Sequence, residues 1–174
     1  MEKEPKQFRT IVDNLQSIVD DLQSMVEVDQ TMRNRCTDNP NEWDGTVDYR
    51  NTERMKVIID KMGWPSISKV GEKGSNNAWL LVQHADHDPE FQKRCLVLMK
   101  SEPEGEVSKS NIAYLEDRIA VGDGRPQTYG TQFHKNSDGQ LVPQPIANEE
   151  KVDERRKDVG LGTLDEYKKR MQEL

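Results

Sequence analysis

The chain is poor in cysteine, in aromatic residues and in long apolar segments. Its two cysteines, Cys36 and Cys95, lie far apart in the sequence, so nothing supports a disulfide and two reduced, buried thiols are expected. No apolar run approaches the roughly 20 residues that a membrane-spanning helix needs. The first residues, "MEKEPKQF", lack the hydrophobic region of a secretory signal. We therefore expect a cytoplasmic protein that has no membrane partner.

Positive charge is also in deficit. The 174 residues contain 25 Lys and Arg against 32 Asp and Glu, which gives a formal net charge of −7. Because binding to nucleic-acid phosphates needs a concentrated basic face, we expect no nucleic-acid partner. Hydrophobic residues make up 33% of the chain, so the core should be thin. The three tryptophans, Trp43, Trp64 and Trp79, are expected to contribute to it.

Apolar residues at helical spacing predict a mainly α fold, a helical bundle of about six to seven helices with a small β-hairpin near residues 127–146. The hairpin is predicted from two extended runs that flank the turn "NSDG". A loop that holds Gly71 and Gly74 should precede the third helix, and Asp88-Pro89 should open the fourth. The helices are expected at residues 6–36, 48–62, 76–86, 89–101, 109–121, 148–160 and 163–172.

The first predicted helix carries a heptad-like apolar stripe over residues 8–32. This pattern is typical of a helix that packs along another helix. The partner can be a helix of the same chain, a second copy in a homodimer, or a helix of another protein. We expect residues 1–27 to form an N-terminal extension of this long helix and residues 28–174 to form a single mostly helical domain.

One aspartate interrupts the stripe. Asp29 occupies a position where an apolar residue is expected. Burial of an unpaired carboxylate is costly, so Asp29 should be paired, metal-bound, protonated or close to solvent. Arg33 lies four residues further on, on the same helix face, and a surface ion pair between the two is one explanation. A polar site is the other, in which Arg33 holds an anionic group of the substrate.

Two of the three histidines lie near the end of the third predicted helix. His84 shares a face with Leu80 and Leu81, so it should point toward the core. The structural explanation is a core histidine bonded to the backbone, with His87 beside the cap of the next helix. The functional explanation is a general base, or a ligand of a divalent metal such as zinc that His87 and His134 would share. The spacing matches no established zinc pattern.

Further polar residues complete the candidate site. Alternation along the first hairpin strand places Gln132 and His134 on one face, and sequence does not decide whether that face lines a cleft or meets solvent. Arg125 follows two glycines in "VGDGRPQTYG", a segment able to hold an anion. The residues expected to be catalytic are His84, Asp29, Asp86 and Tyr129; those expected to bind substrate are Arg33, Gln83, Gln132 and Arg125; those expected to bind metal are His84, His87 and His134.

Five segments together resemble one known family: "GWPSISKVG", "NNAWLLVQHADHDPEFQKRCLVLMK", "GEVSKSNIAYLEDRI", "GRPQTYGTQFH" and "VDERRKDVGL". The family is largely bacterial and is catalogued as domain of unknown function 6624. The resemblance covers about residues 25–168 and implies that a set of polar residues recurs together, as the members of a shared site would. That set matches Asp29, Gln30 and Arg33, the segment Gly63-Trp64-Pro65, the segment Gln83-His84-Ala85-Asp86 and the segment Tyr129-Gly130-Thr131-Gln132. No activity comes with the resemblance.

Two functions remain open, and a third, a small-molecule-binding protein that uses the Arg125 loop, ranks below them. One is a small cytoplasmic enzyme, either a metal-dependent hydrolase or another proton-transfer enzyme, that acts on a small polar or anionic molecule in a pocket of His, Asp, Gln and Tyr side chains. The other is a non-catalytic binding or adaptor protein that uses residues 8–32 to engage a partner helix or to dimerise. Convergence in space of His84, Asp29, Tyr129 and His134 would favour the enzyme.

Overall fold

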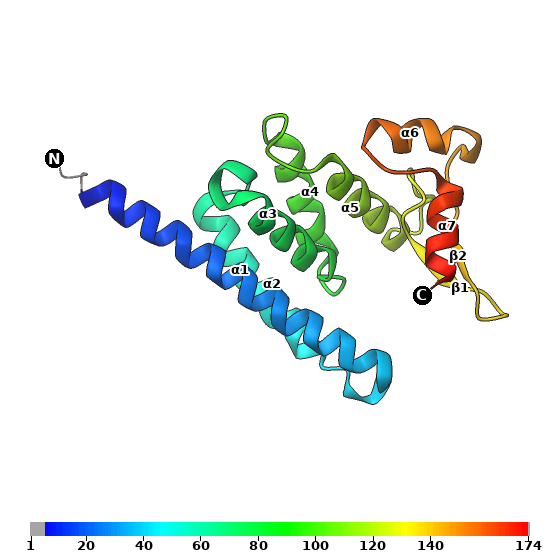
Figure 1. The fold of residues 1–174 in the computed structure, drawn as a ribbon, viewed down its shortest axis with the longest axis horizontal. Helices are drawn as coiled ribbons and strands as arrows, with labels where there is room; N and C mark the ends of the chain where they lie inside the picture. The colour runs from blue at the N-terminus through cyan, green and yellow to red at the C-terminus, as the bar shows by residue number, and fades with distance from the viewer. Residues whose placement is uncertain (1–5, 174) are drawn as a thin grey trace.

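The fold is mainly α, with one small hairpin, as the sequence predicts. The computed structural model describes residues 6–173, except for the side chains of residues 6–13, 38 and 40. Within these residues, none of the helices combines the length and the apolar character that a membrane span requires. The α-helices of the described range are α1 (Lys6–Asp38), α2 (Gly45–Met62), α3 (Ile67–Gln83), α4 (Pro89–Ser101), α5 (Lys109–Gly122), α6 (Val152–Asp158) and α7 (Leu164–Gln172) (Figure 1). They are joined by the 3₁₀ helices η1 (Pro40–Glu42) and η2 (Glu149–Lys151) and by the strands β1 (Phe133–Lys135) and β2 (Leu141–Pro143).

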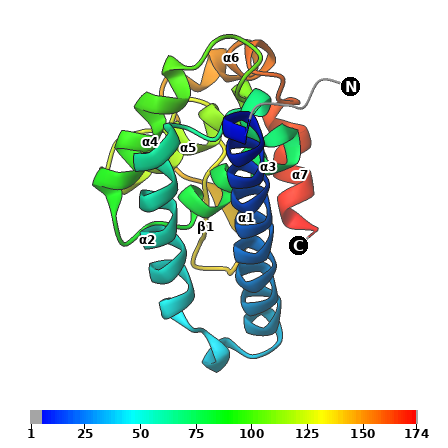
Figure 2. The same ribbon diagram turned by 90° about the vertical axis from the view of Figure 1, so that its left-hand side faces the viewer.

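The long helix α1 turns its apolar stripe toward the rest of the chain. Figure 2 shows α1 and α2 side by side, and α3 packs on both. Leu22 is fully buried in the core, and Ile18 and Met25 pack against it. Over these positions the partner of α1 is therefore intramolecular. The side chains of Phe8, Ile11 and Val12, which the predicted stripe includes, lie outside the described residues.

The connection from α2 to α3 differs from the prediction. Gly63 ends α2 with a positive φ of 73°, as expected, but α3 already begins at Ile67. The predicted loop is wrong in its extent, because only Gly71 leaves the helical conformation and Gly74 lies within the helix. Gly71 takes a φ of 75° and kinks α3 without ending it. Gly74 fits against Val70, where a Cβ would lie 2.9 Å from the Cβ of that valine.

Local capping chemistry sets several boundaries where the sequence places them. The Asp88 side chain accepts a hydrogen bond from the backbone N–H of Phe91, and Pro89 occupies the first turn of α4. Thr163 and Glu166 form the predicted capping box of α7. At the start of α2, Asp44 caps the helix, which begins three residues before the predicted Asp48.

The hairpin lies at the opposite end of the molecule from the N-terminus of α1, beside α7 (Figure 1). Its strands pair in antiparallel register, with His134 opposite Val142. The ring of Phe133 contacts Tyr167 of α7, with ring centroids 5.3 Å apart, and His134 is exposed. The Phe133 face therefore packs on the helices, and His134, on the alternating face, meets solvent.

Candidate active site

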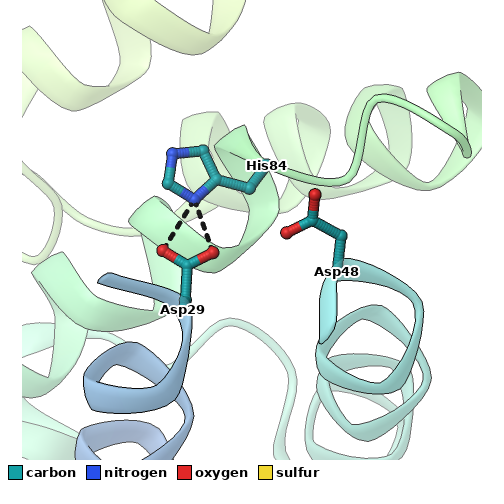
Figure 3. Close-up of side chains that lie close together, drawn as sticks. All are labelled: Asp29, Asp48 and His84. Carbon is teal, nitrogen blue, oxygen red and sulfur yellow. Dashed lines mark hydrogen bonds and ion pairs between the residues drawn. The ribbon is translucent and has the colours of Figure 1, made fainter. Parts of the chain in front are cut away.

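A buried carboxylate of α1 meets the end of α3 at the centre of the candidate site. Asp29 is fully buried, and both of its oxygens lie 3.0 Å from Nδ1 of His84 (Figure 3). Gln30 donates its Nε2–H to Oδ2 at 2.8 Å, and Arg33 donates its Nε–H to Oδ1 at 3.0 Å. The expected pair with Arg33 is present, but it is part-buried rather than a surface pair, because the Asp29 side chain is fully buried and that of Arg33 is 25% exposed.

These contacts decide the charge state of Asp29. Burial by itself raises the pKa of a carboxyl group, because it penalises the charged form. The hydrogen bonds from His84 and Gln30, and the positive charge of Arg33, outweigh burial and lower the pKa of Asp29 below its ordinary value. Asp29 is therefore a carboxylate at neutral pH and orients the donors around it.

His84 owes its position to the end of α3. It is the C-cap residue, with φ −90° and ψ 2°, and its backbone N–H donates to the carbonyl of Leu80. The backbone is thus satisfied locally, and the side chain reaches across to α1 instead of bonding to the backbone. Its exposed fraction is 17%, so the ring is shielded on the Asp29 side and accessible elsewhere.

The tautomer of His84 follows from what surrounds Nδ1. A lone pair on Nδ1 would face two carboxylate oxygens of Asp29 at 3.0 Å, and two acceptors repel at that distance. The Nε–H of Arg33 is directed at both Asp29 Oδ1, 3.0 Å away, and Nδ1, 3.1 Å away, and the charged carboxylate oxygen is the stronger acceptor of that hydrogen. We therefore assign the proton of the neutral ring to Nδ1, which leaves the lone pair on Nε2. Nε2 is turned away from Asp29 and makes no hydrogen bond to a described residue (Figure 3).

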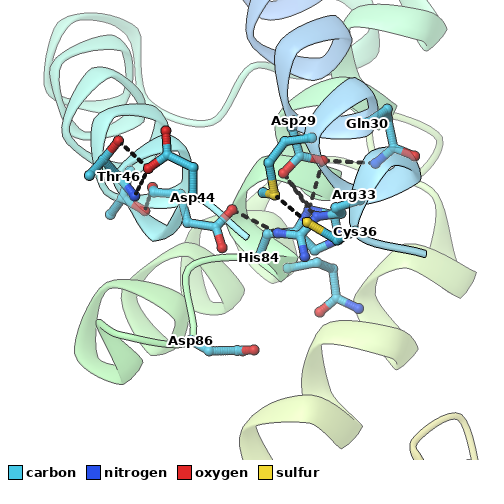
Figure 4. Close-up of polar contacts among 12 residues, drawn as sticks. Asp29, Gln30, Arg33, Cys36, Asp44, Thr46, His84 and Asp86 are labelled. Carbon is cyan, nitrogen blue, oxygen red and sulfur yellow. Dashed lines mark hydrogen bonds and ion pairs between the residues drawn. The ribbon is translucent and has the colours of Figure 1, made fainter. Parts of the chain in front are cut away.

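Arg33 links this pair to α2. Its Nη2 donates to Oδ1 of Asp48 at 2.7 Å, so one guanidinium bridges the carboxylates of two helices. Figure 4 shows Gln30, Arg33 and His84 converging on Asp29. The guanidinium also lies over the Trp43 ring, 5.1 Å from its centroid. Burial raises the pKa of Asp48 above its ordinary value, although the charge of Arg33 opposes the shift.

A small cleft adjoins this network, and we call it the site cleft. Its volume is about 290 Å³. The rings of Tyr49 and His87 stack at its edge, with centroids 4.9 Å apart and planes inclined by 22°. Trp43 is 50% exposed, so the prediction that it belongs to the core is wrong. The lining residues are Arg33, Trp43, Gly45, Asp48, Tyr49, His84, Asp86 and His87.

Asp86 connects the cleft to α5 and to the hairpin segment. Arg118 donates its Nε–H to Oδ1 of Asp86 at 2.7 Å, and its Nη1–H to Oε1 of Gln132 at 3.3 Å. Desolvation opposes ionisation of Asp86, but the hydrogen bonds from Arg118 and Gln92 lower its pKa, and the side chain stays 62% exposed. Asp86 therefore pairs with Arg118 rather than with His84, which leaves Asp29 as the residue that orients the imidazole.

One group of side chains has the composition of a metal site. Donor atoms of Asp29, Asp48 and His84 all lie within 4.8 Å of one another. The Arg33 guanidinium bonds to both of these carboxylates, so it already supplies the positive charge that a metal ion would bring. A metal ligated by both aspartates would have to displace it. The predicted trio of histidines does not form this group: His87 stacks on Tyr49, and His134 lies on the hairpin.

The remaining predicted residues fall into two sets. Gln83 is 5% exposed and adjacent to His84, and its Oε1 has no hydrogen-bond partner among the described residues. Tyr129 and Arg125 do not line the site cleft: Tyr129 donates its backbone N–H to Asp117, and Arg125 pairs with Asp123 at the surface. Of the four residues whose convergence would favour an enzyme, the structure brings together Asp29 and His84. The roles assigned to the others stay predictions.

Sequence reasoning missed Arg118, Asp48 and Tyr49. Asp48 stands where a helix was expected to begin, so it reads as an ordinary first-turn acid. Tyr49 is an isolated aromatic residue on a polar helix face and gives no signal. Asp117, the residue before Arg118, is a carboxylate on the buried face of α5. It interrupts that face as Asp29 interrupts the apolar face of α1, and this signal could have directed attention to Arg118.

Residues 15–174 match one protein family, described as "Family of unknown function (DUF6624)". The match spans most of the chain, so the chain belongs to this family, and the resemblance seen in the sequence is confirmed. No curated protein and no solved structure matches the chain.

Proposed function

We propose that this member of the DUF6624 family is an acid–base enzyme, in which His84, held by Asp29, moves a proton to or from a small polar substrate in the site cleft. The observation that carries the proposal is the contact of Nδ1 with both oxygens of a fully buried carboxylate. A carboxylate in that position fixes the tautomer and stabilises the imidazolium that forms when Nε2 accepts a proton. We also propose a cytoplasmic location, which the free thiols of Cys36 and Cys95 support.

Hydrolysis is the reaction that these groups serve best. A water molecule would lose a proton to Nε2 of His84 while its oxygen attacks the substrate, and the imidazolium would then return that proton to the leaving group. Arg33 lines the same cleft, and its Nη1 makes no hydrogen bond within the described part of the chain. Its N–H groups are suited to stabilise negative charge that develops on a substrate oxygen.

The contacts of Arg33 support a mechanism without a metal. A metal ion held by Asp29, Asp48 and His84 would need the space and the carboxylate oxygens that the guanidinium uses. A metal-dependent hydrolase remains the alternative, and it requires Arg33 to swing out of the cluster. The two mechanisms differ in their response to a chelator.

The test is turnover of a panel of chromogenic probes: p-nitrophenyl esters of short acids, an anilide and a phosphomonoester. We expect a probe to be hydrolysed with a rate that falls about 100-fold or more in His84→Ala. The rate should fall similarly in Asp29→Asn and should not change with EDTA. His134→Ala controls for hydrolysis by an exposed histidine, and its rate should equal that of the wild type. Equal rates for wild type and His84→Ala on every probe would refute the proposal.

The adaptor alternative has less support. This alternative rests on the apolar stripe of residues 8–32, but from Ile18 to Met25 the stripe packs against α2 and α3 of the same chain. A helix whose apolar face is already covered offers less to a partner. Sedimentation of the full chain at several concentrations tests the alternative, because a homodimer through α1 would dissociate on dilution.

A further inference from the structure

The site carries one more negative charge than positive charge while His84 is neutral. Its three carboxylates belong to Asp29, Asp48 and Asp86, and the two guanidiniums that bond to them belong to Arg33 and Arg118. The nearby Lys56 is already paired with Asp88. An anionic ligand would therefore add to an existing excess of negative charge, whereas a cationic ligand would neutralise it.

Asp48 is the carboxylate that is best placed to meet such a ligand. Its Oδ1 accepts the hydrogen bond of Arg33, and no hydrogen bond from a described residue reaches its Oδ2. The side chain is 13% exposed and lines the site cleft. Figure 3 shows this carboxylate facing the Asp29–His84 pair from α2, so a ligand bound to it would lie beside the imidazole.

The aromatic residues of the cleft point to the same chemistry. Among the described large hydrophobic side chains that stay exposed, the aromatic ones are Trp43 and Tyr49, at 50% and 61%, and both line this cleft. Stacking on His87 holds the Tyr49 ring in place. The faces of aromatic rings attract cations, and the Arg33 guanidinium over Trp43 is an example within the site itself.

We propose that the site cleft binds its substrate through an organic cation, an alkylammonium or guanidinium group that pairs with Asp48 and lies against the rings of Trp43, Tyr49 and His87. This inference names the substrate class of the proposed enzyme and rests on that proposal for the role of the cleft. A volume of about 290 Å³ is at the lower limit of ligand pockets, which fits a small cation better than a nucleotide or a long chain.

Binding of choline, compared with its neutral isostere 3,3-dimethylbutan-1-ol, tests the inference. The two molecules have the same shape and differ in charge. In two-dimensional ¹H–¹⁵N NMR spectra, choline should shift the indole N–H signal of Trp43 and the amide signals of Tyr49 and His87, and these shifts should saturate. The isostere should bind roughly five-fold more weakly or worse. The indole signals of Trp64 and Trp79 serve as internal references.

Variants separate the charge from the rings. Asp48→Asn should weaken choline binding roughly five-fold and leave binding of the isostere unchanged, whereas Tyr49→Ala should weaken both. Asp60→Asn, which removes an exposed carboxylate further along α2, is the matched control and should bind choline like the wild type. Tyr49 is largely exposed, so its variant is expected to fold, and a thermal melt of each variant checks this.

Three results would overturn the inference: equal binding of choline and the isostere, shifts outside the site cleft, or stronger perturbation of the cleft by inorganic phosphate than by choline. The outcome is independent of the proposed reaction. If the cleft binds choline but His84→Ala hydrolyses every probe as fast as the wild type, the cation-binding site stands and the enzyme proposal is refuted. If His84→Ala loses turnover as expected but the cleft binds choline no better than its neutral isostere, the enzyme proposal stands and this substrate class is refuted.

Discussion

Nδ1 of His84 lies 3.0 Å from each carboxylate oxygen of Asp29, across the contact between α1 and α3. The two residues are 55 positions apart, so the pair exists only in the folded chain. A carboxylate that would otherwise be a defect in the apolar face of α1 is stabilised there by hydrogen bonds. The same hydrogen bonds prepare His84 to act as a base, so stability and the proposed chemistry depend on one contact.

Removal of the Asp29 carboxylate should be strongly destabilising. Asp29→Ala leaves the buried donor of His84 without an acceptor and Arg33 with Asp48 as its remaining partner, and an unsatisfied buried donor costs about 1–3 kcal/mol. Asp21 also pairs with an arginine, Arg54, but both side chains are more than a third exposed, so Asp21→Ala should cost less than about 1 kcal/mol. Urea denaturation measures both free energies of unfolding. Equal values for the two variants would contradict burial of the Asp29 pair.

The contribution of Asp29 should depend on pH. Its pKa is lower in the folded chain than the ordinary value of 3.8, so just below that pH the unfolded chain binds more protons. The stabilisation is therefore complete above the ordinary value and is lost as pH falls through the folded pKa. The difference in unfolding free energy between wild type and Asp29→Asn, measured in urea, should shrink at low pH. A constant difference down to the acid limit would show that Asp29 is not the titrating group.

Gly130 should tolerate a methyl group far less well than Gly139. Both have positive φ angles, 69° and 78°, so alanine costs backbone strain of about 1 kcal/mol at either position. At Gly130 a Cβ would also lie 2.8 Å from Leu164 and 2.9 Å from Ile146, whereas nothing lies within 4 Å at Gly139. Gly130→Ala should therefore lose a further 1–3 kcal/mol or so through overpacking. Thermal melts of the two variants make the comparison, and equal melting temperatures would contradict the close packing of this turn.

The elements that local hydrogen bonds define could be predicted from the sequence. The Asp88 cap, the box of Thr163 and Glu166, and the hairpin turn from Asn136 to Gly139 each depend on a few adjacent residues. The start of α3 could not be predicted, because the chain is helical on both sides of Gly71, which alone has a non-helical φ of 75°. Glycine in a sequence indicates backbone freedom without saying whether a loop or a kinked helix uses it.

For the candidate site, too, the sequence predicts local features but not the contacts between helices. Asp29 and His84 each interrupt an apolar helix face, and that interruption is visible in one helix at a time. Their meeting, and the approach of Asp48 and Arg118, depend on how α1, α2, α3 and α5 pack, which sequence periodicity does not specify. Tyr129 belongs instead to a turn whose backbone N–H groups bond to Asp117, where burial raises the pKa of the carboxyl and these donors oppose the shift.

The two thiols should differ in reactivity. Cys95 is fully buried, and burial raises the pKa of its thiol to about 12. The thiolate is the reactive form, so Cys95 should not react with an aromatic disulfide reagent while the protein is folded. Cys36 is partly exposed and should account for the single thiol titrated in the native protein, with the second appearing on unfolding. Cys36→Ser should abolish the native reaction; a remaining fast thiol would contradict the burial of Cys95.

The position of the proton on His84 tests the central claim most directly. In ¹⁵N-labelled protein, long-range ¹H–¹⁵N correlation spectra of the neutral ring distinguish Nδ1–H from Nε2–H. The Asp29 contact predicts Nδ1–H in the wild type and loss of that preference in Asp29→Ala, with His134 as an exposed reference in the same spectrum. A neutral His84 that carries its proton on Nε2 in the wild type would mean that Arg33 Nε, rather than Asp29, is bonded to Nδ1, and would contradict the assignment of His84 as the base.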